Sequence, residues 1–433
     1  MSTIAPKFRL GHFIASLTDN IFWGVVLFTL IGLPIVFIVL FFIELPEIDG
    51  KLLSPYLAVT YIADPSRTLP IIQSLIQTDF FKIVAFPGFG FAALIAGATI
   101  FIERKFLAKI QLRPGPFYCG KVEGILQLMA DGLKLISKEI IIPAKADKPI
   151  FWAAPVLFVA TAAAFVSLIP VAPGWVVADL DVGLIAVFAI IGFFPIITIL
   201  VSWAANSKFP FIGGIRALHQ MVSFEIPLIL SLLGIVILTG TLNLSEIVAS
   251  QAGIWWIVFL PIGAIVFFIS ILAELERIPF DLPEAESEIV AGWLTEFSGM
   301  MYGLVQLGSY VKLYAFAGLF VTLFLGGWHG PMVVPPFPEE IITEGITMGP
   351  ISIKIPGLPL FSQEMLNGTL WFVIKTMGVI MVILLPRGVF PRIRIDLLLH
   401  VGWYKLIGLC FLNLFIALGL IYAGVLGPEG FIQ

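Results

Sequence analysis

The sequence has little charge, little cysteine and little histidine. Asp, Glu, Lys and Arg make up 12% of the 433 residues, about half the ~25% of a typical soluble protein. So few charges cannot cover the surface of a soluble fold of this length. The two cysteines are too few for a disulfide framework or an iron–sulfur cluster, and the four histidines lie in predicted loops or at span ends. We therefore expect no metal and no haem in this chain.

Apolar residues are abundant instead. They form 59% of the chain, and the mean hydropathy is +1.07. A membrane span needs about 20 apolar residues. These features predict an all-α polytopic membrane protein with about nine transmembrane helices, near 21–45, 80–102, 151–170, 182–205, 223–242, 254–273, 301–327, 367–386 and 403–427.

The distribution of Lys and Arg predicts the orientation of these spans. Threading the chain from a cytoplasmic N-terminus places residues 1–20 and the predicted loops 103–150, 206–222, 274–300 and 387–405 on one side. This side holds 18 of the 24 basic residues, and the opposite loops hold three. Cytoplasmic loops carry the excess of basic residues. The N-terminus is therefore predicted to be cytoplasmic and the C-terminus outside. The first span is read as a retained anchor, because no small-residue cleavage site follows it.

A long predicted loop between the second and third spans has helical periodicity. Apolar residues recur at helical spacing from Val122 to Ile136, while Asp131, Lys134 and Lys138 lie elsewhere around the helix. This pattern predicts an amphipathic helix near 122–138 that lies at the membrane surface or against a partner. No internal repeat is apparent, so the repeat architecture of many transporters has no support.

An acidic run interrupts the basic side at the predicted loop 274–300. The loop contains seven acidic residues and one arginine. Acidic residues have little influence on the orientation of a protein in the membrane, so orientation does not explain their presence. Neighbouring carboxylates raise one another's pKa and can load and release protons together. A solvated acidic loop is the other interpretation. The interleaved prolines and apolar residues, Pro279, Phe280, Leu282 and Pro283 among them, favour a loop packed into a cavity.

Four ionisable residues fall within or at the ends of predicted spans: Glu225, Glu274, Lys312 and Lys375. An ionisable group at that depth costs several kcal/mol unless it is paired or hydrated. Each one alone could extend to the interface. Together, beside an acidic loop, they indicate a hydrated polar path into the membrane.

Ten segments between about residues 80 and 427 carry charged residues, prolines or glycines in a distinctive order. In order along the chain, nine of them are Glu103-Arg104-Lys105, Arg113-Pro114-Gly115-Pro116, Ala130-Asp131-Gly132-Leu133-Lys134, Ile142-Pro143-Ala144, Ser207-Lys208, Gly214-Ile215-Arg216, Gln220-Met221-Val222-Ser223-Phe224-Glu225, Gly326-Gly327-Trp328-His329-Gly330-Pro331 and Arg387-Gly388-Val389-Phe390-Pro391-Arg392. The most specific segment is Pro279-Phe280-Asp281-Leu282-Pro283-Glu284-Ala285-Glu286-Ser287-Glu288. Together these segments resemble the H-subunit family of respiratory complex I, which includes subunit 1 of the mitochondrial NADH dehydrogenase, and the most specific one is similar throughout to the family's PFDLPEAESE.

The resemblance implies a non-redox membrane subunit of an ion-translocating quinone oxidoreductase in the plasma or inner membrane. Such a subunit forms much of the quinone chamber and the start of the proton path between the redox arm and the membrane arm. It binds no cofactor of its own, and quinone is the substrate of the complex. Its expected partners are hydrophilic iron–sulfur and quinone-site subunits docked on cytoplasmic loops, other membrane-arm subunits, and lipid. The matching acidic positions, implied to carry protons, are Glu225, Glu274, Asp281, Glu284, Glu286 and Glu288, and the matching basic positions near quinone are Arg104, Arg113 and Arg216.

Two departures from the family stand out. The family has eight spans, so residues 1–79 look like an added anchor with an external loop, and 80–433 form the family-like domain. Ser309 stands where the family often has a glutamate, so one acidic step is missing or supplied elsewhere. A subunit of a membrane-bound hydrogenase and a stand-alone carrier remain alternatives. The electron donor, whether NADH, ferredoxin or a deazaflavin, is not encoded in this chain.

Overall fold

The computed structural model describes residues 47–48, 51–52, 79–119, 124, 126–331 and 363–424. Two short antiparallel strands, β1 (Glu47–Ile48) and β2 (Lys51–Leu52), pair with Glu47 opposite Leu52. All other named elements in the described residues are helices. The chain is therefore all-α in character, as predicted, while the predicted span at 21–45 lies outside the described residues.

Seven helical segments of the described part are long and apolar enough to cross a membrane. Each coincides with a predicted span. They are built from α6 (Asp79–Val84) with α7 (Phe89–Ile110), α9 (Lys148–Ser167), α10 (Gly183–Ile191) with α11 (Phe193–Ala204), α12 (Lys208–Thr239), α17 (Gly299–Phe324), α19 (Gln363–Val389), and α20 (Ile395–His400) with the π-helix η3 (Val401–Leu406) and α21 (Ile407–Tyr422).

The predicted span at 254–273 is broken. A four-residue helix, α14 (Trp256–Phe259), is separated from α15 (Pro261–Glu274) by Leu260, which caps both helices. Pro261 has no amide hydrogen and suits the first position of a new helix. At 1.5 Å per residue, α15 is about 21 Å long, which is shorter than the ~30 Å apolar layer of a bilayer. The number of nine spans therefore stays a prediction.

Two segments that the sequence analysis treated as loops are largely helical. The predicted loop 206–222 belongs to α12, so Arg216 and His219 lie on a helix rather than in a loop. The 32 residues of α12 extend about 48 Å, well beyond the ~30 Å apolar layer, so its first turns can carry polar side chains. Most of the predicted loop 387–405 is likewise helical, in α19, α20 and η3.

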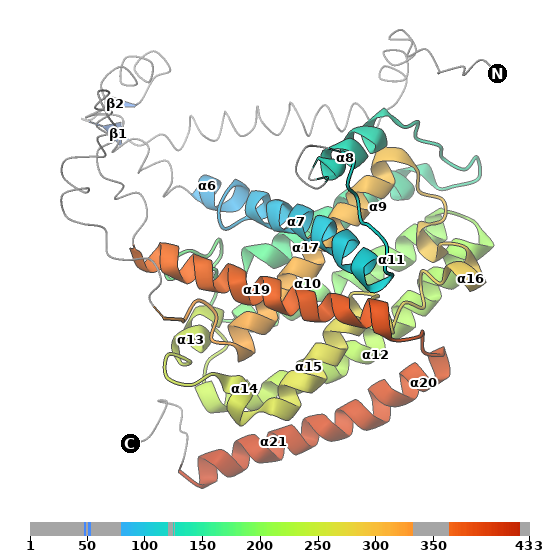
Figure 1. Cartoon of the computed structure of the whole chain (residues 1–433). Helices are drawn as coiled ribbons and strands as arrows, with labels where there is room; N and C mark the ends of the chain where they lie inside the picture. Colours follow the sequence, from blue (N-terminus) through green and yellow to red (C-terminus); the bar gives the residue numbers. More distant parts are fainter. Residues whose placement is uncertain are drawn as a thin grey trace.

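Helix α17 is the centre of the packing. It contacts α7, α9, α15 and α19, and 83% of the residues in its most apolar stretch of 18 residues are buried. Gly308 permits the close approach of α9, because a β-carbon there would lie 2.6 Å from the Phe158 ring. The second packing unit is α12 with α11, α15 and α21, and α21 lies along the outside of the bundle (Figure 1).

The predicted amphipathic helix is present as α8 (Gln127–Ser137). The described helix starts five residues later than the predicted start. None of its residues is buried, and Met129 and Leu133 are about two-thirds exposed. It touches the bundle where Leu135 packs against Gly303 of α17. The remaining short helices are α13 (Leu244–Ala249), α16 (Glu286–Ile289) and the 3₁₀-helix η2 (Gly292–Leu294).

Candidate functional site

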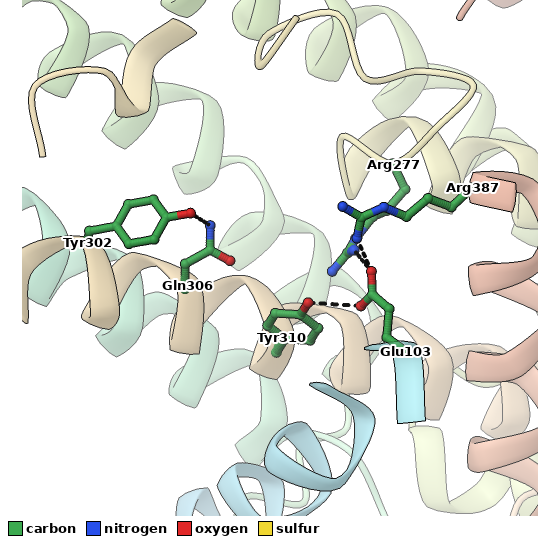
Figure 2. Close-up of polar contacts among 6 residues, drawn as sticks. All are labelled: Glu103, Arg277, Tyr302, Gln306, Tyr310 and Arg387. Carbon is green, nitrogen blue, oxygen red and sulfur yellow. Dashed lines mark hydrogen bonds and ion pairs between the residues drawn. The ribbon is translucent and has the colours of Figure 1, made fainter. Parts of the chain in front are cut away.

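A buried carboxylate, Glu103, joins four separate elements. It lies near the end of α7 and is 2% exposed. Its Oε1 atom accepts a hydrogen bond of 2.8 Å from Nη1 of Arg277, which follows α15, and also pairs with Arg387 near the end of α19. Its Oε2 atom accepts a hydrogen bond of 2.8 Å from the hydroxyl of Tyr310 on α17 (Figure 2).

This group of four residues has an excess of positive charge. Two guanidiniums share one carboxylate, and the Arg277 guanidinium also lies 4.9 Å from the centre of the Tyr310 ring. Arg387 is 40% exposed, so its second face remains open to other groups. A partly hydrated, positively charged centre of this kind can hold an anion or polarise a carbonyl oxygen.

The predicted intramembrane pair Lys312 and Glu274 come together. Both side chains are almost fully buried, and Lys312 Nζ lies 3.6 Å from Oε2 of Glu274. Nζ also donates a 2.7 Å hydrogen bond to the main-chain oxygen of Glu274. The ammonium therefore neutralises the carboxylate and satisfies one of the carbonyls left free where α15 ends.

Glu225 lies on α12 at the break between α10 and α11. Gly192 occupies this break, and a β-carbon there would lie 3.3 Å from Oε1 of Glu225. The glutamate is only partly buried, and it lies within electrostatic reach of Lys312. Glu225, Lys312 and Glu274 thus form one group, and the predicted polar path through them stays a prediction.

The acidic segment 275–298 is packed into the protein rather than solvated. Phe280, Leu282 and Ala285 are buried. Gly292 adopts a φ of +54°, and a β-carbon on it would lie 1.6 Å from the main-chain oxygen of Pro283. A β-carbon on Gly213 of α12 would lie 2.7 Å from the α-carbon of Gly292. This agrees with the packed interpretation of the loop.

Besides the Arg277–Glu103 pair, two ion pairs tie this acidic segment to neighbouring parts of the chain. Nη1 of Arg216 on α12 lies 2.5 Å from Oε2 of Glu288. Nη2 of Arg392, which follows α19, lies 3.1 Å from Oδ2 of Asp281. Burial raises the pKa of the Asp281 carboxyl even though Arg392 acts to lower it. Glu284 and Glu286 belong to the same segment, and Glu286 starts α16.

The other two predicted quinone-binding arginines lie elsewhere. Arg104 pairs with Asp131 of α8 and is 45% exposed. Burial acts to raise the pKa of Asp131, but hydrogen bonds from Arg104 and Gln127 outweigh it, so the pKa is lowered. Arg113 donates a 2.7 Å hydrogen bond to Gln111 at an exposed turn after α7. Arg104, Arg113 and Arg216 therefore contact three different partners.

Lys375 is separate from these groups. Its Nζ atom donates to the main-chain oxygens of Leu325, Gly327 and His329, at 2.7, 3.1 and 2.6 Å. These carbonyls lie just after α17, so Lys375 closes the end of that helix. The structure gives this lysine a helix-capping geometry and does not bring it to Lys312.

Sequence reasoning missed five residues of these groups. Glu103 and Arg387 were quoted only within motifs, and Arg277, Tyr310 and Glu276 were not singled out. Glu276 is partly buried, with its Oε1 atom enclosed, and its Oε2 atom accepts a 3.2 Å hydrogen bond from Trp293. Ser309, at the departure from the family, donates to the main-chain oxygen of Val305 and offers no ionisable group.

The described residues thus form a helical, polytopic membrane protein with a buried ionic network at one end. A model of the NADH dehydrogenase family matches residues 83–418, and the chain belongs to that family. It is 40% identical over 340 residues to the H subunit of the NADH-quinone oxidoreductase of Geobacillus sp. (strain WCH70), covering 77% of this chain and 93% of that protein. It is 40% identical over 353 residues to the corresponding protein of Bacillus cytotoxicus, covering 80% and 97%, and 39% identical over 353 residues to that of Bacillus thuringiensis (strain Al Hakam), with the same coverage.

Proposed function

We propose that this chain is the membrane subunit that joins the redox arm to the membrane arm of an ion-translocating quinone oxidoreductase. It lines much of the quinone chamber and starts the proton path that quinone reduction drives. The names of its relatives, which are H subunits of NADH-quinone oxidoreductases, support this assignment. The chain itself carries no redox group, and it acts only within the complex.

The observation that carries the proposal is a series of buried and partly buried charged groups. It runs from the acidic segment through Glu103 and its arginines to the Lys312–Glu274 pair and Glu225. Removing charges from water costs several kcal/mol per ion in real proteins. A fold that needed only stability would fill these places with apolar side chains, so a series of this length supports a charge-handling role.

The proposed mechanism couples two charge changes. Reduction of quinone to quinol takes up two electrons and two protons, so negative charge appears at the headgroup before the protons arrive. This negative charge would be stabilised by the two arginines that pair with Glu103 and by Arg104, Arg113 and Arg216. Glu284, Glu286 and Glu288 would load protons in response, and Glu274, Asp281 and Glu225 would pass them inward.

Partner subunits would dock on the side that carries α8. The exposed Met129 and Leu133 and the exposed turn at Arg113 present a mixed apolar and basic surface to hydrophilic iron–sulfur and quinone-site subunits. Other membrane-arm subunits and lipid would cover the apolar flanks. The N-terminus would be cytoplasmic and the C-terminus outside.

Two other functions can be distinguished by purification. A hydrogenase-type subunit would co-purify with hydrogenase activity rather than with quinone-reducing activity. A stand-alone carrier would purify from detergent extracts without other subunits. We expect a tagged chain to bring iron–sulfur subunits and quinone reductase activity with it. Isolation of the chain as a stable, active single protein would contradict the proposal.

A further inference from the structure

Glu276 occupies a helix-end position that normally belongs to glycine. At the end of α15 the amide of Glu276 donates to the Ala273 oxygen, and the amide of Arg277 donates to the Leu272 oxygen, both at 3.2 Å. This pair of bonds defines a Schellman motif, whose left-handed residue is usually glycine because a β-carbon is unfavourable there. Glu276 has a φ of +51°, so a side chain is retained where its absence would suit the backbone.

The retained side chain is directed inward. Nε1 of Trp293 donates to Oε2 of Glu276 at 3.2 Å, whereas Oε1 is enclosed and accepts no hydrogen bond from the residues that the structure describes. Trp293 is 2% exposed and packs between the rings of Phe158 and Phe297. The indole is thus fixed, and it holds the carboxyl in one orientation. Ending helix α15 requires neither the hydrogen bond from Trp293 nor an enclosed carboxyl oxygen.

Charged groups further along the acidic segment and on α17 act on this carboxyl. Glu284 and Asp281 act from the acidic segment, and Lys312 acts from α17. Along its own chain Glu276 lies between Glu274, which pairs with Lys312, and Arg277, which binds Glu103. Burial, followed by the charge of Glu284, raises the pKa of Glu276 to about 8 although Lys312 opposes the shift. Both protonation states are therefore accessible near neutral pH.

From this placement we infer that Glu276 is a proton-exchanging carboxyl between Glu284, further along the acidic segment, and the Lys312–Glu274 pair. The inference rests on the proposed function. A proton that leaves Glu284 as it ionises neutralises Glu276. Release of the same proton to the Glu274 carboxylate restores the Glu276 carboxylate, so the two transfers move one proton from Glu284 to Glu274 and leave the charge of Glu276 unchanged. Trp293 acts as a positioning residue that sets the proton affinity of Glu276.

The backbone geometry offers a test in which stability and activity move in opposite directions. Glu276→Gly removes the carboxyl and relieves the unfavourable φ, so the assembled complex should unfold at the same or a higher temperature. Its coupled quinone reduction at pH 7 should fall at least fivefold. Leu112→Gly is the matched control for the backbone effect, because Leu112 takes the same position at the end of α7 with a φ of +54° and is 96% exposed.

Glu276→Gln and Trp293→Phe complete the experiment in the whole complex. The glutamine keeps an acceptor for Trp293 but carries no proton, so turnover should fall at least fivefold and the alkaline limb of the wild-type pH profile, near pH 8, should disappear. Trp293→Phe removes a hydrogen bond that favours the ionised form and should move that limb to higher pH.

Wild-type turnover and an unchanged pH profile in Glu276→Gln would overturn the inference, even if the glycine variant failed to assemble. Failure of the proposed function has a different signature. Normal proton translocation by Glu284→Gln/Glu286→Gln would overturn the whole proton path. Normal translocation by the Glu276 variants alone would remove only this carboxyl from it.

Discussion

The Nζ atom of Lys312 lies 2.7 Å from the main-chain oxygen of Glu274 and 3.6 Å from its carboxylate. One ammonium thus closes the end of α15 and balances a buried acid, directly before the acidic segment begins. Any change in the charge of the pair is therefore felt at the helix end, where the segment is anchored. This contact links the intramembrane helices to the loop that we propose loads protons.

Loss of the ammonium should be costly. Lys312→Met leaves Glu274 buried without a cation, and breaking a buried pair in this way costs about 3–5 kcal/mol. We expect a lower unfolding temperature and less assembled complex, measured by thermal unfolding in detergent. Lys208→Met, which removes an exposed lysine, is the control and should unfold like the wild type. Equal unfolding temperatures for both variants would show that the pair contributes nothing.

Glu103 should contribute most to the stability of its group of four residues, because it contacts the other three. Glu103→Gln leaves Arg277 and Arg387 facing each other without a carboxylate, and we expect destabilisation of about 3–5 kcal/mol. Adding Arg387→Gln should recover part of the loss, because it removes one of two like charges. A double-mutant cycle on unfolding temperature measures this coupling. Strictly additive effects of Glu103→Gln and Arg387→Gln would mean that the Glu103 and Arg387 side chains do not interact.

Arg216 should depend on its guanidinium and not only on its charge. Arg216→Lys keeps the positive charge but loses the planar fork that holds Glu288. We expect a severalfold lower quinone reductase turnover with an unchanged amount of assembled complex, quantified by blue-native gels. Wild-type turnover in this variant would reduce Arg216 to a charge that serves orientation alone.

Glu276 makes stability depend on pH in a defined direction. Its pKa is about 8 in the folded protein, against 4.5 for an unperturbed glutamate. Between these values the folded state binds one proton more than the unfolded state, so this group makes stability fall as pH rises from about 4.5 to about 8. Glu276→Gln lacks this dependence. The difference in unfolding temperature between variant and wild type should therefore shift in favour of the variant as the pH rises to 8.

Much of the fold could be predicted from the sequence because apolar runs and amphipathic periodicity are local signals. Seven apolar runs predicted as spans coincide with helices long enough to cross a membrane, and α8 follows the spacing of its apolar residues. Helix ends were less predictable. Lys208 and Arg216 resembled loop residues by charge, yet α12 is long enough to carry them beyond an apolar layer. Pro261 divides a run that by composition alone resembled one span.

The candidate site was predicted by residue type but not by pairing. The prediction grouped Glu225, Glu274, Lys312 and Lys375, because charges within apolar runs need partners, and the structure brings together only the first three. The partners of Glu103 lie 174, 207 and 284 residues away in sequence, and no local pattern connects such positions. Glu276 was missed for another reason. Its role depends on a positive φ and on the indole of Trp293, and both arise only when α15 ends against η2.

The most direct test of the central claim is the number of protons translocated per quinone reduced by the reconstituted complex. Glu284→Gln/Glu286→Gln should abolish translocation while the complex remains assembled, whereas Glu364→Gln, which changes an exposed acid in the first turn of α19, should translocate like the wild type. Full translocation by the double variant, at the wild-type ratio of protons to quinone, would contradict the account.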